Sequence, residues 1–553
     1  MNQQMNQNGP MQQAAPPPQS YNPPPNPQGF MPPPNGMYAT RPVVNQPMQR
    51  PTAPITKTER LFAVITLVLG FFFVRFVLAN CLSLFTTLFF IALTVATMIY
   101  LRCKNVPFKG DTIFGAFFLG LFSTVFIFNT NAFITFLATV FLMVGNGYLA
   151  FHATSDSKGI EQFLFYALNK TVFEYGFSNF DTFFKNAKSH KEKKPNGEIK
   201  KHEGLGKNIL YIIIGLVIAF PLTIIVCGLL ISADSQLAEL LHKIFNFSLE
   251  QIFVVGVQLL LAIPVAAYIF SGLFSAATKF RITPYSDERY LAGLKKARFT
   301  PNMIIYAAVT PISLLYILFF FSQLNYFISA FMGKTADGLI YSEFAREGFF
   351  ELCFVAIINL AVLMFMSYCS KQTGEEKPVA LRIFSGFLAL STIVIIISAL
   401  SKMYLYIDEY GLTQSRIYAS WFMITLGMIF LVIFFRQFMK KFAIMKPCFY
   451  IVTAMFTLLC FARTDALIVD YNVNKYLTGQ IEELDTSMFF YELSDDGLAA
   501  MLRHKDTIEE ECGSKLYYNI KDRQIDYRDD YYEKLTFSGF MIAVQDLETL
   551  KQD

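Results

Sequence analysis

The feature that most constrains this sequence is a series of apolar windows, each about 20 residues long. A helix of about 20 apolar residues matches the hydrocarbon thickness of a bilayer, and lipid offers no partner to an unpaired backbone group. The sequence therefore predicts an all-α polytopic membrane helix bundle of about eleven transmembrane helices. The windows lie near residues 61–78, 82–101, 113–129, 131–151, 208–232, 252–276, 302–330, 348–368, 383–404, 417–435 and 447–462.

The composition agrees with a membrane protein. Of the 553 residues, 54% are hydrophobic and 16% are charged, whereas soluble chains contain about 25% charged residues. The formal net charge of +4 is small for this length and does not indicate nucleic acid as a partner. The eight cysteines form no CxxC pair, and HExxH and GxSxG motifs are absent. We therefore predict no metal, no cofactor and no catalytic residue.

Two terminal regions differ from the predicted bundle, which spans residues 58–463. Residues 1–57 are rich in Pro, Gln and Asn and predict a disordered tail. Its Pro runs are candidate docking sites for a protein partner, although a solvated tail without a fixed partner is the favoured interpretation. Residues 464–553 contain 20 acidic residues against nine Lys and Arg. They predict a small α-rich domain outside the membrane, in which one or two strands remain an alternative, and which is a second candidate surface for protein partners.

Lys and Arg are distributed unevenly over the connections between windows. The connection 152–207 contains ten lysines, whereas 233–250 contains only Lys243 and 128–131 contains no basic residue. Basic residues mark cytoplasmic connections, and the alternation continues through all eleven windows. The pattern predicts a multi-pass protein with its N-terminus inside and its C-terminus outside the membrane.

The basic connection 152–207 also contains many aromatic residues. Phe163, Phe165, Phe173 and Phe177 alternate with polar positions before the run of lysines. One interpretation is an amphipathic segment that rests on the inner leaflet, with membrane lipids as its partners. The other is a loop that packs against the helix bundle, and the sequence favours neither.

Acidic and basic side chains cluster where the eighth window begins. Glu343, Arg346, Glu347 and Glu351 are three or four residues apart and lie on one side of a predicted helix. A carboxylate close to the apolar region needs a cationic partner or water, and Lys402 near the end of the ninth window is the candidate partner.

The stretch "SKMYLYIDEYGLTQSRIY" predicts a tight helical hairpin between the ninth and tenth windows. Tyr406 and Tyr410 lie where aromatic side chains concentrate at membrane surfaces. We expect Gly411 to end the first helix in a left-handed cap, and Thr413 to cap the second helix, which has Arg416 in its first turn. Helix anchoring and turning are favoured over a binding role for these residues.

Two further helices are predicted after the last window. "RTDALIVDYNVNKYLTGQ" predicts a helix with Thr464 as its cap and Gly479 as its end. "LSDDGLAAMLRH" predicts a second helix that starts at Ser494, with Asp495 and Asp496 complementing the helix dipole.

Three blocks of the chain carry a resemblance to a known family. "KMYLYIDEYGLTQSRIYASWFM", "YSEFAREGFFELCFVAIINL" and "DALIVDYNVNKYL", the last followed by "LDTSMFFYELSDDGLAAML", resemble an uncharacterised bacterial membrane family, domain of unknown function 4173, whose sibling is numbered 4153. The resemblance implies a multi-spanning protein of the bacterial cytoplasmic membrane. It supplies no activity.

Three functions remain open. The favoured hypothesis is a non-enzymatic envelope sensor or scaffold, whose polar motifs on the outer face include Glu343, Arg346, Glu347, Glu351, Lys402, Tyr406, Tyr410 and Arg416. The first alternative is a transporter of a neutral or lipid-like substrate, with helices broken at Pro221, Pro264 and Pro311. The second is a membrane enzyme at the outer leaflet, with the region of Glu351 as acid or base.

Overall fold

The computed structural model describes residues 55–79, 83–155, 164–185, 249–283, 295–331, 341–371, 378–439, 444–529 and 535–545, with two short strands and a few isolated positions between 186 and 294. The predicted tail, 1–57, lies outside the described residues except for its last three positions. The predicted window 208–232 also lies outside them except for isolated positions.

The protein is a multi-pass membrane helix bundle. In the part of the chain that the structure describes, nine helices are long and apolar enough to cross a membrane, and a pair bent by 63° is a tenth candidate. Nine of these helices confirm predicted windows, and the bent pair covers the last window, 447–462, as a tenth candidate. The candidates are α1 with η1 (Lys57–Phe72, Phe73–Leu78), α2 (Leu84–Cys103), α3 with α4 (Gly110–Phe122, Val125–Phe128), α5 (Ala132–Thr154), α11 (Leu249–Thr278), α13 (Asn302–Phe331), α14 (Tyr341–Cys369), α15 (Val379–Tyr410), α16 (Gln414–Arg436), and the bent pair α17 (Met445–Phe461) and α18 (Thr464–Leu477).

The first apolar core joins α1, α2, α3, α5 and α11 and includes the end of α17. Aromatic rings fill much of it. Phe62 stacks on Tyr100 with 4.2 Å between ring centroids, and Phe122 stacks on Phe456 of α17 at 5.7 Å. Because lipid is as apolar as these rings, close packing rather than water exclusion must favour this association.

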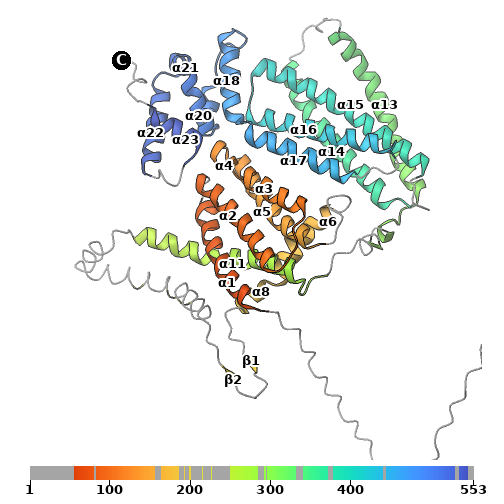
Figure 1. Ribbon diagram of the computed structural model, residues 1–553. Coiled ribbons are helices and arrows are strands. Elements are labelled where there is room, and N and C mark those ends of the chain that lie inside the picture. The colour runs from red at the N-terminus through yellow and green to blue at the C-terminus, as the bar shows by residue number, and fades with distance from the viewer. Residues whose placement is uncertain are drawn as a thin grey trace, which may run out of the picture. The chain divides into compact units, whose positions relative to one another are not determined.

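A second core lies among α13, α14, α15 and α16, and Figure 1 shows these helices side by side. Asn359 of α14 is 1% exposed. Its Oδ1 accepts a 2.6 Å hydrogen bond from the Tyr316 hydroxyl of α13, and its Nδ2 donates to Thr392 Oγ1 of α15 at 2.9 Å. The buried amide therefore connects three helices.

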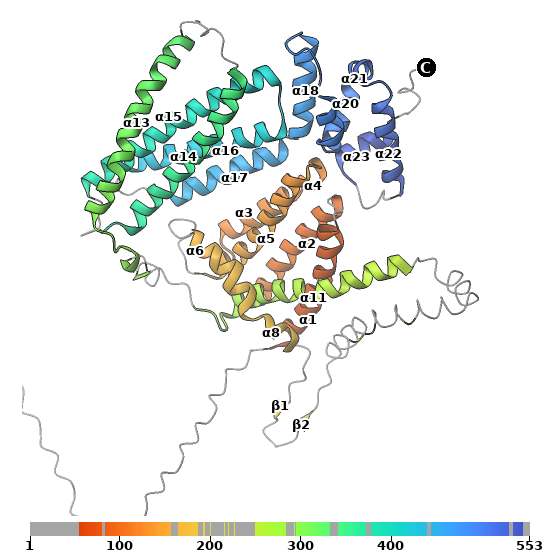
Figure 2. The same ribbon diagram turned by 180° about the vertical axis from the view of Figure 1, so that it is seen from behind.

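Helices α1 and α11 approach each other at Gly70, and both views show them adjacent (Figure 1 and Figure 2). A Cβ at position 70 would lie 2.6 Å from the carbonyl oxygen of Ala262 and 3.0 Å from the backbone nitrogen of Ala266. Backbone atoms cannot move aside easily, so this contact requires glycine on α1 and small residues on α11.

The connection after α5 packs against the bundle on one face. It folds into α6 (Leu164–Asn169), η2 (Lys170–Tyr175), α7 (Gly176–Ser178) and α8 (Phe180–Lys185), and α7 and α8 contact α11. Tyr175 and Phe183 are buried, whereas Phe165, Phe173 and Phe177 are 63%, 60% and 58% exposed. One face of this segment therefore packs against the bundle, as the second of the two interpretations predicts. The exposed phenylalanines on the other face remain available for contact with the inner leaflet, as the first interpretation predicts. Farther along, β1 (Glu192–Lys193) pairs antiparallel with β2 (Ile199–Lys200).

Two carboxylates attach this segment to the turn that follows α11. Glu174 Oε1 accepts 2.8 Å hydrogen bonds from the backbone nitrogen and the hydroxyl of Thr283, and Asp181 accepts from Arg281 Nη1 at 2.9 Å. Burial raises the pKa of both carboxyls, but the hydrogen bonds and nearby cations outweigh it and hold each pKa below its ordinary value. Both groups are therefore charged at neutral pH, where the attachment is fully formed.

The described elements after α18 are all helices. They are α19 (Thr486–Tyr491), α20 (Asp495–Met501), η3 (Leu502–His504), α21 (Lys505–Cys512), α22 (Lys515–Asp529) and α23 (Phe537–Val544). With α18 they enclose a third core around Val469, Val473, Phe489, Ile508 and Ile520. The described part of this region therefore agrees with the predicted α-rich domain and contains none of the one or two strands given as the alternative.

The contact at Gly70 yields a stability prediction. We expect Gly70→Ala to lower the stability of the detergent-solubilised protein by about 1–3 kcal/mol, because the added methyl overpacks the α1–α11 contact. Gly120→Ala is the matched control, since no atom lies within 4 Å of a Cβ built there. Thermal unfolding of both variants measures the difference, and equal stability would contradict the close-packing account.

Candidate functional site

The predicted hairpin forms between α15 and α16. Helix α15 ends at Tyr410, and Gly411 has φ +74° and ψ −173°. The positive φ agrees with the predicted glycine ending, but the ψ value is extended, so the expected left-handed cap is wrong. A Cβ at Gly411 would also lie 2.5 Å from Asn472 Oδ1. Thr413 is the N-cap of α16, although its side chain makes no capping hydrogen bond.

Arg416 closes the hairpin from the first turn of α16. Its Nη1 donates to the carbonyl oxygen of Tyr410 at 2.9 Å and also to that of Gly411. Its guanidinium lies 4.1 Å from the ring centroid of Tyr406, whose ring is 5.2 Å from that of Tyr410. The cation thus satisfies carbonyls at the C-terminus of α15, where the helix dipole favours positive charge.

Helix α18 binds the hairpin through two side chains. Asn472 Oδ1 accepts a 2.7 Å hydrogen bond from the backbone nitrogen of Leu412, and Asn472 Nδ2 donates to the Leu412 carbonyl at 2.8 Å. Lys475 Nζ donates to the carbonyl of Asp408 at 2.6 Å and pairs with its carboxylate at 2.5 Å. The hairpin is therefore fixed to the C-terminal helices.

The other predicted candidates lie on α14 and α15. Lys402 Nζ lies 2.8 Å from where a Cβ at Gly348 would stand, and the charge of Glu351, one helical turn later, acts on it. This agrees with the predicted Glu351–Lys402 partnership. Glu343, Arg346 and Glu347 lie on α14 by their backbone, while their side chains lie outside the described part of the structure.

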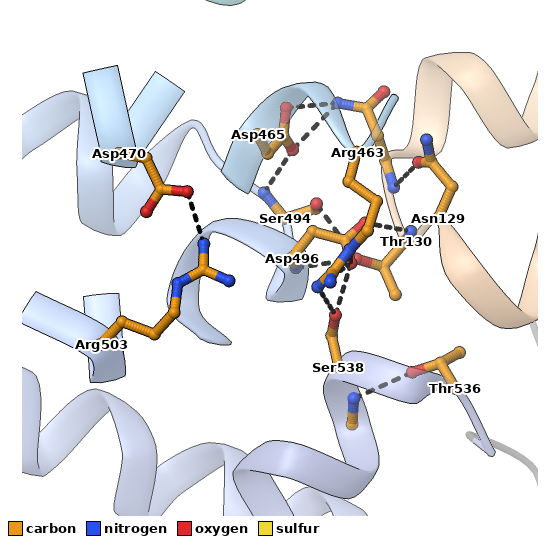
Figure 3. Close-up of polar contacts among 12 residues, drawn as sticks. Asn129, Thr130, Arg463, Asp465, Asp470, Ser494, Asp496, Arg503, Thr536 and Ser538 are labelled. Atoms are coloured by element: carbon orange, nitrogen blue, oxygen red, sulfur yellow. Dashed lines mark hydrogen bonds and ion pairs between the residues drawn. The ribbon is translucent and has the colours of Figure 1, made fainter. Parts of the chain in front are cut away.

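A network of polar residues, which we call the polar junction, was not predicted from the sequence. It connects the loop between α4 and α5, the break between α17 and α18, the start of α20 and the start of α23 (Figure 3), and it also includes the start of α16. Its members are Asn129, Thr130, Asn131, Gln414, Arg463, Asp465, Ser494, Asp496 and Ser538.

Asp465 is the first of two buried carboxylates in the polar junction. It is 0% exposed. It accepts hydrogen bonds from Asn131 Nδ2 at 3.1 and 3.2 Å, from Gln414 Nε2 at 2.9 Å and from the backbone nitrogen of Ser494 at 2.9 Å. These donors come from α5, α16 and α20 or their caps, so one side chain on α18 connects all of them.

Asp496 is the second buried carboxylate of the polar junction, and its exposed fraction is 1%. It accepts from the backbone nitrogen of Thr130 at 2.8 Å, from Arg463 Nη2 at 3.2 Å and from the Ser538 hydroxyl. Its own backbone nitrogen donates to Thr130 Oγ1 at 3.0 Å. This exchange joins α20 to the loop before α5, and Arg463 supplies the opposite charge.

Arg463 occupies the break between α17 and α18. Its φ of +48° and ψ of +58° are left-handed, which is uncommon for a residue other than glycine. The predicted cap is wrong by one residue, because α18 begins at Thr464 and Arg463 is its N-cap. Helix α18 ends at Leu477, just before the predicted Gly479 (φ +67°), and α20 begins at Asp495 with the predicted Ser494 as its N-cap.

The polar junction is suited to holding helices together rather than to binding a ligand. Its carboxylates are buried and already accept several hydrogen bonds, which offset the cost of removing a charge from water. Among the described residues, no group of three His, Cys, Asp or Glu is arranged to hold a metal ion. The arrangement holds the C-terminal helices against the spans.

Asn472 provides a direct test of the attachment between α18 and the hairpin. We expect Asn472→Ala to cost about 1–3 kcal/mol, because the N–H and carbonyl of Leu412 both lose their partner. Asn474→Ala, on the exposed face of the same helix, is the control. Thermal unfolding and protease cleavage within residues 401–418 measure the effect. If the two variants behave alike, Asn472 does not hold the hairpin.

Comparison with known proteins gives a family but no activity. Residues 116–504 match the family described as Domain of unknown function (DUF4153). The resemblance indicated from the sequence is therefore broadly right, but the matching family is the sibling rather than the one numbered 4173. No curated protein and no solved structure matches the chain significantly. Because the match extends over well over half of the chain and includes the hairpin, Asp465 and Asp496, this protein belongs to the DUF4153 family.

Proposed function

We propose that the protein is a non-enzymatic sensor or scaffold of the bacterial cell envelope, in which the helix bundle holds the C-terminal helices at the outer face of the cytoplasmic membrane. The observation that carries this proposal is the polar junction. Its side chains bond to one another across five elements and fix the C-terminal helices to the spans. A domain held in this way can transmit or resist a displacement of the helices that bind it.

The proposed orientation is supported by the connections that meet at the polar junction. The loop 128–131 contains no basic residue, whereas 152–207, at the other end of α5, contains ten lysines. The α15–α16 hairpin and the α17–α18 break meet this loop through Gln414, Asp465 and Asn131. These contacts support one common side for the three connections, and the distribution of Lys and Arg favours the outside.

The predicted outer-face residues belong to the same proposal. Glu351 with Lys402, and Arg416 with Tyr406 and Tyr410, form two polar groups at one end of α15. We assign them to the surface that would receive a signal or a protein partner. Glu343, Arg346 and Glu347 remain proposed members of this surface.

The alternatives have less support. Pro264 and Pro311 lie inside continuous helices, α11 and α13, so the described helices do not break there as the transport hypothesis requires. Pro221 lies outside the described residues. For the enzyme hypothesis, the charge of the exposed Glu351 acts on Lys402, which favours an electrostatic role for this carboxylate over a catalytic one.

Labelling of native cysteines tests the orientation. Cys512 lies in α21, and Cys103 is exposed at the end of α2. We expect a membrane-impermeant maleimide to label Cys512 in intact spheroplasts and Cys103 only after lysis. Burial, with the neighbouring Glu511 carboxylate, raises the pKa of the Cys512 thiol despite the opposing charge of Lys515, so labelling is done at about pH 8.5, where more thiolate forms.

A second cysteine position protects the labelling test against poor reactivity. Tyr491 is 84% exposed in the C-terminal helices, so Tyr491→Cys combined with Cys512→Ser should label in the same way. Labelling of either position only after lysis would place this region in the cytoplasm and overturn the proposed orientation.

Complementation tests the function itself. In a deletion strain grown under envelope stress, we expect Glu351→Gln and Arg416→Ala to restore survival less well than wild type at equal protein level and thermal stability. Glu483→Gln, at an exposed position outside the proposed surface, should restore it fully. If both surface variants restore survival like wild type, the proposed surface has no role.

A further inference from the structure

A large apolar crevice opens between two groups of spans. Its volume is about 1370 Å³, which exceeds the few hundred to 1000 Å³ of most small-molecule sites. Side chains of α3, α5, α14, α16 and α17 line it, with α6 at one end. Most of these side chains are apolar, and α17 contributes lining residues along its whole length, from Met445 to Phe461.

The charged residues that line the crevice, and its histidine, lie at one end of it, while Thr453 and Thr457 line it farther along α17. Asp111 begins α3, His152 is in the last turn of α5, Tyr368 is near the end of α14, and Lys446 is in the first turn of α17. Because successive spans run in opposite directions, the starts of α3 and α17 lie on the same side as the ends of α5 and α14. The crevice is thus amphipathic along the membrane normal.

Of the charged side chains that line the crevice, Asp111 and Lys446 are opposite in sign, and three further cations, Lys109, Arg382 and Arg436, lie close to this end. Lys446 is exposed and lines the crevice, and the charges of Lys109 and Asp111 both act on His152. Arg436 ends α16 beside the lining residue Gln437. Its Nη1 donates to the Met439 carbonyl at 2.7 Å, and the charge of Arg382 acts on it unfavourably. An anion held between these groups would relieve the repulsion and neutralise the excess charge.

We propose that the crevice binds one anionic phospholipid, with its acyl chains between the spans and its phosphate at Lys446. The apolar lining suits acyl chains, which are the material available at this depth, and the positive end selects an anionic headgroup. Leu164, Phe165 and Leu168 of α6 line the same end, so the segment after α5 covers the bound lipid. This site goes beyond the proposed sensor or scaffold function and does not depend on it.

The test uses the full-length protein in nanodiscs that contain a trace of phosphatidylglycerol with a photoactivatable acyl chain. We expect crosslinks on α5 and α17 to the crevice-lining residues. Ala454→Trp fills the crevice from an exposed position of α17, and Lys446→Glu reverses the charge at its polar end. Lys446→Glu should lower crosslinking about fivefold or more, the loss expected when one basic contact to anionic lipid is removed. Ala454→Trp should also lower it, because the added ring occupies space that an acyl chain would take.

Matched controls separate a binding site from general contact with lipid. Leu315→Trp adds the same ring at a 63% exposed position of α13, and Lys371→Glu reverses an exposed lysine after α14. Neither residue lines the crevice, so both variants should crosslink like wild type.

Three outcomes would overturn the proposal. The first is that the probe crosslinks to α13 and to the crevice-lining residues in equal yield. The second is wild-type yield in Ala454→Trp. The third is equal crosslinking by a phosphatidylcholine probe with the same acyl chain, which would show that the site does not select an anionic headgroup.

Discussion

A carboxylate withdrawn from water costs several kcal/mol unless donors replace the lost hydration. Asp465 and Asp496 are both almost fully buried, and their donors come from segments that are more than 300 residues apart in the sequence. The C-terminal helices, the α15–α16 hairpin and the loop before α5 must therefore come together for these charges to be satisfied. This requirement fixes where α18 leaves the membrane bundle and how α20 approaches it.

The same requirement explains local features around the polar junction. Arg463 adopts a left-handed backbone conformation where α17 turns into α18, and its guanidinium reaches Asp496 and Ser538 from there. Asn472 and Lys475, farther along α18, then lie against the hairpin. Gly411 has no side chain, which leaves the space that Asn472 Oδ1 occupies.

Much of the membrane architecture follows from the sequence, because each span must satisfy its backbone hydrogen bonds within a single apolar segment. The position of the hairpin and the need for glycine at 411 follow from local chemistry in the same way. The polar junction does not, because Asn129, Thr130 and Asn131 are neutral and occur in a short connection that shows no charge pattern. The two aspartates at the start of α20 can be recognised in the sequence, but their contact with Thr130 exists only in the folded protein. Likewise, the packing of the 164–185 segment depends on contacts with α11 that no local pattern encodes.

A double-mutant cycle between Asn131 and Asp465 measures the central interaction most directly. Asn131→Ala also removes the cap of α5, since Asn131 Oδ1 accepts from the backbone nitrogens of Phe133 and Ile134, but that loss occurs in the single and the double variant and cancels in the cycle. The account predicts that Asn131→Ala and Asp465→Ala together cost less than the sum of their separate effects on unfolding, by about 0.5–3 kcal/mol. Additive effects within error would contradict the account, because the carboxylate on α18 would then not depend on the amide that precedes α5.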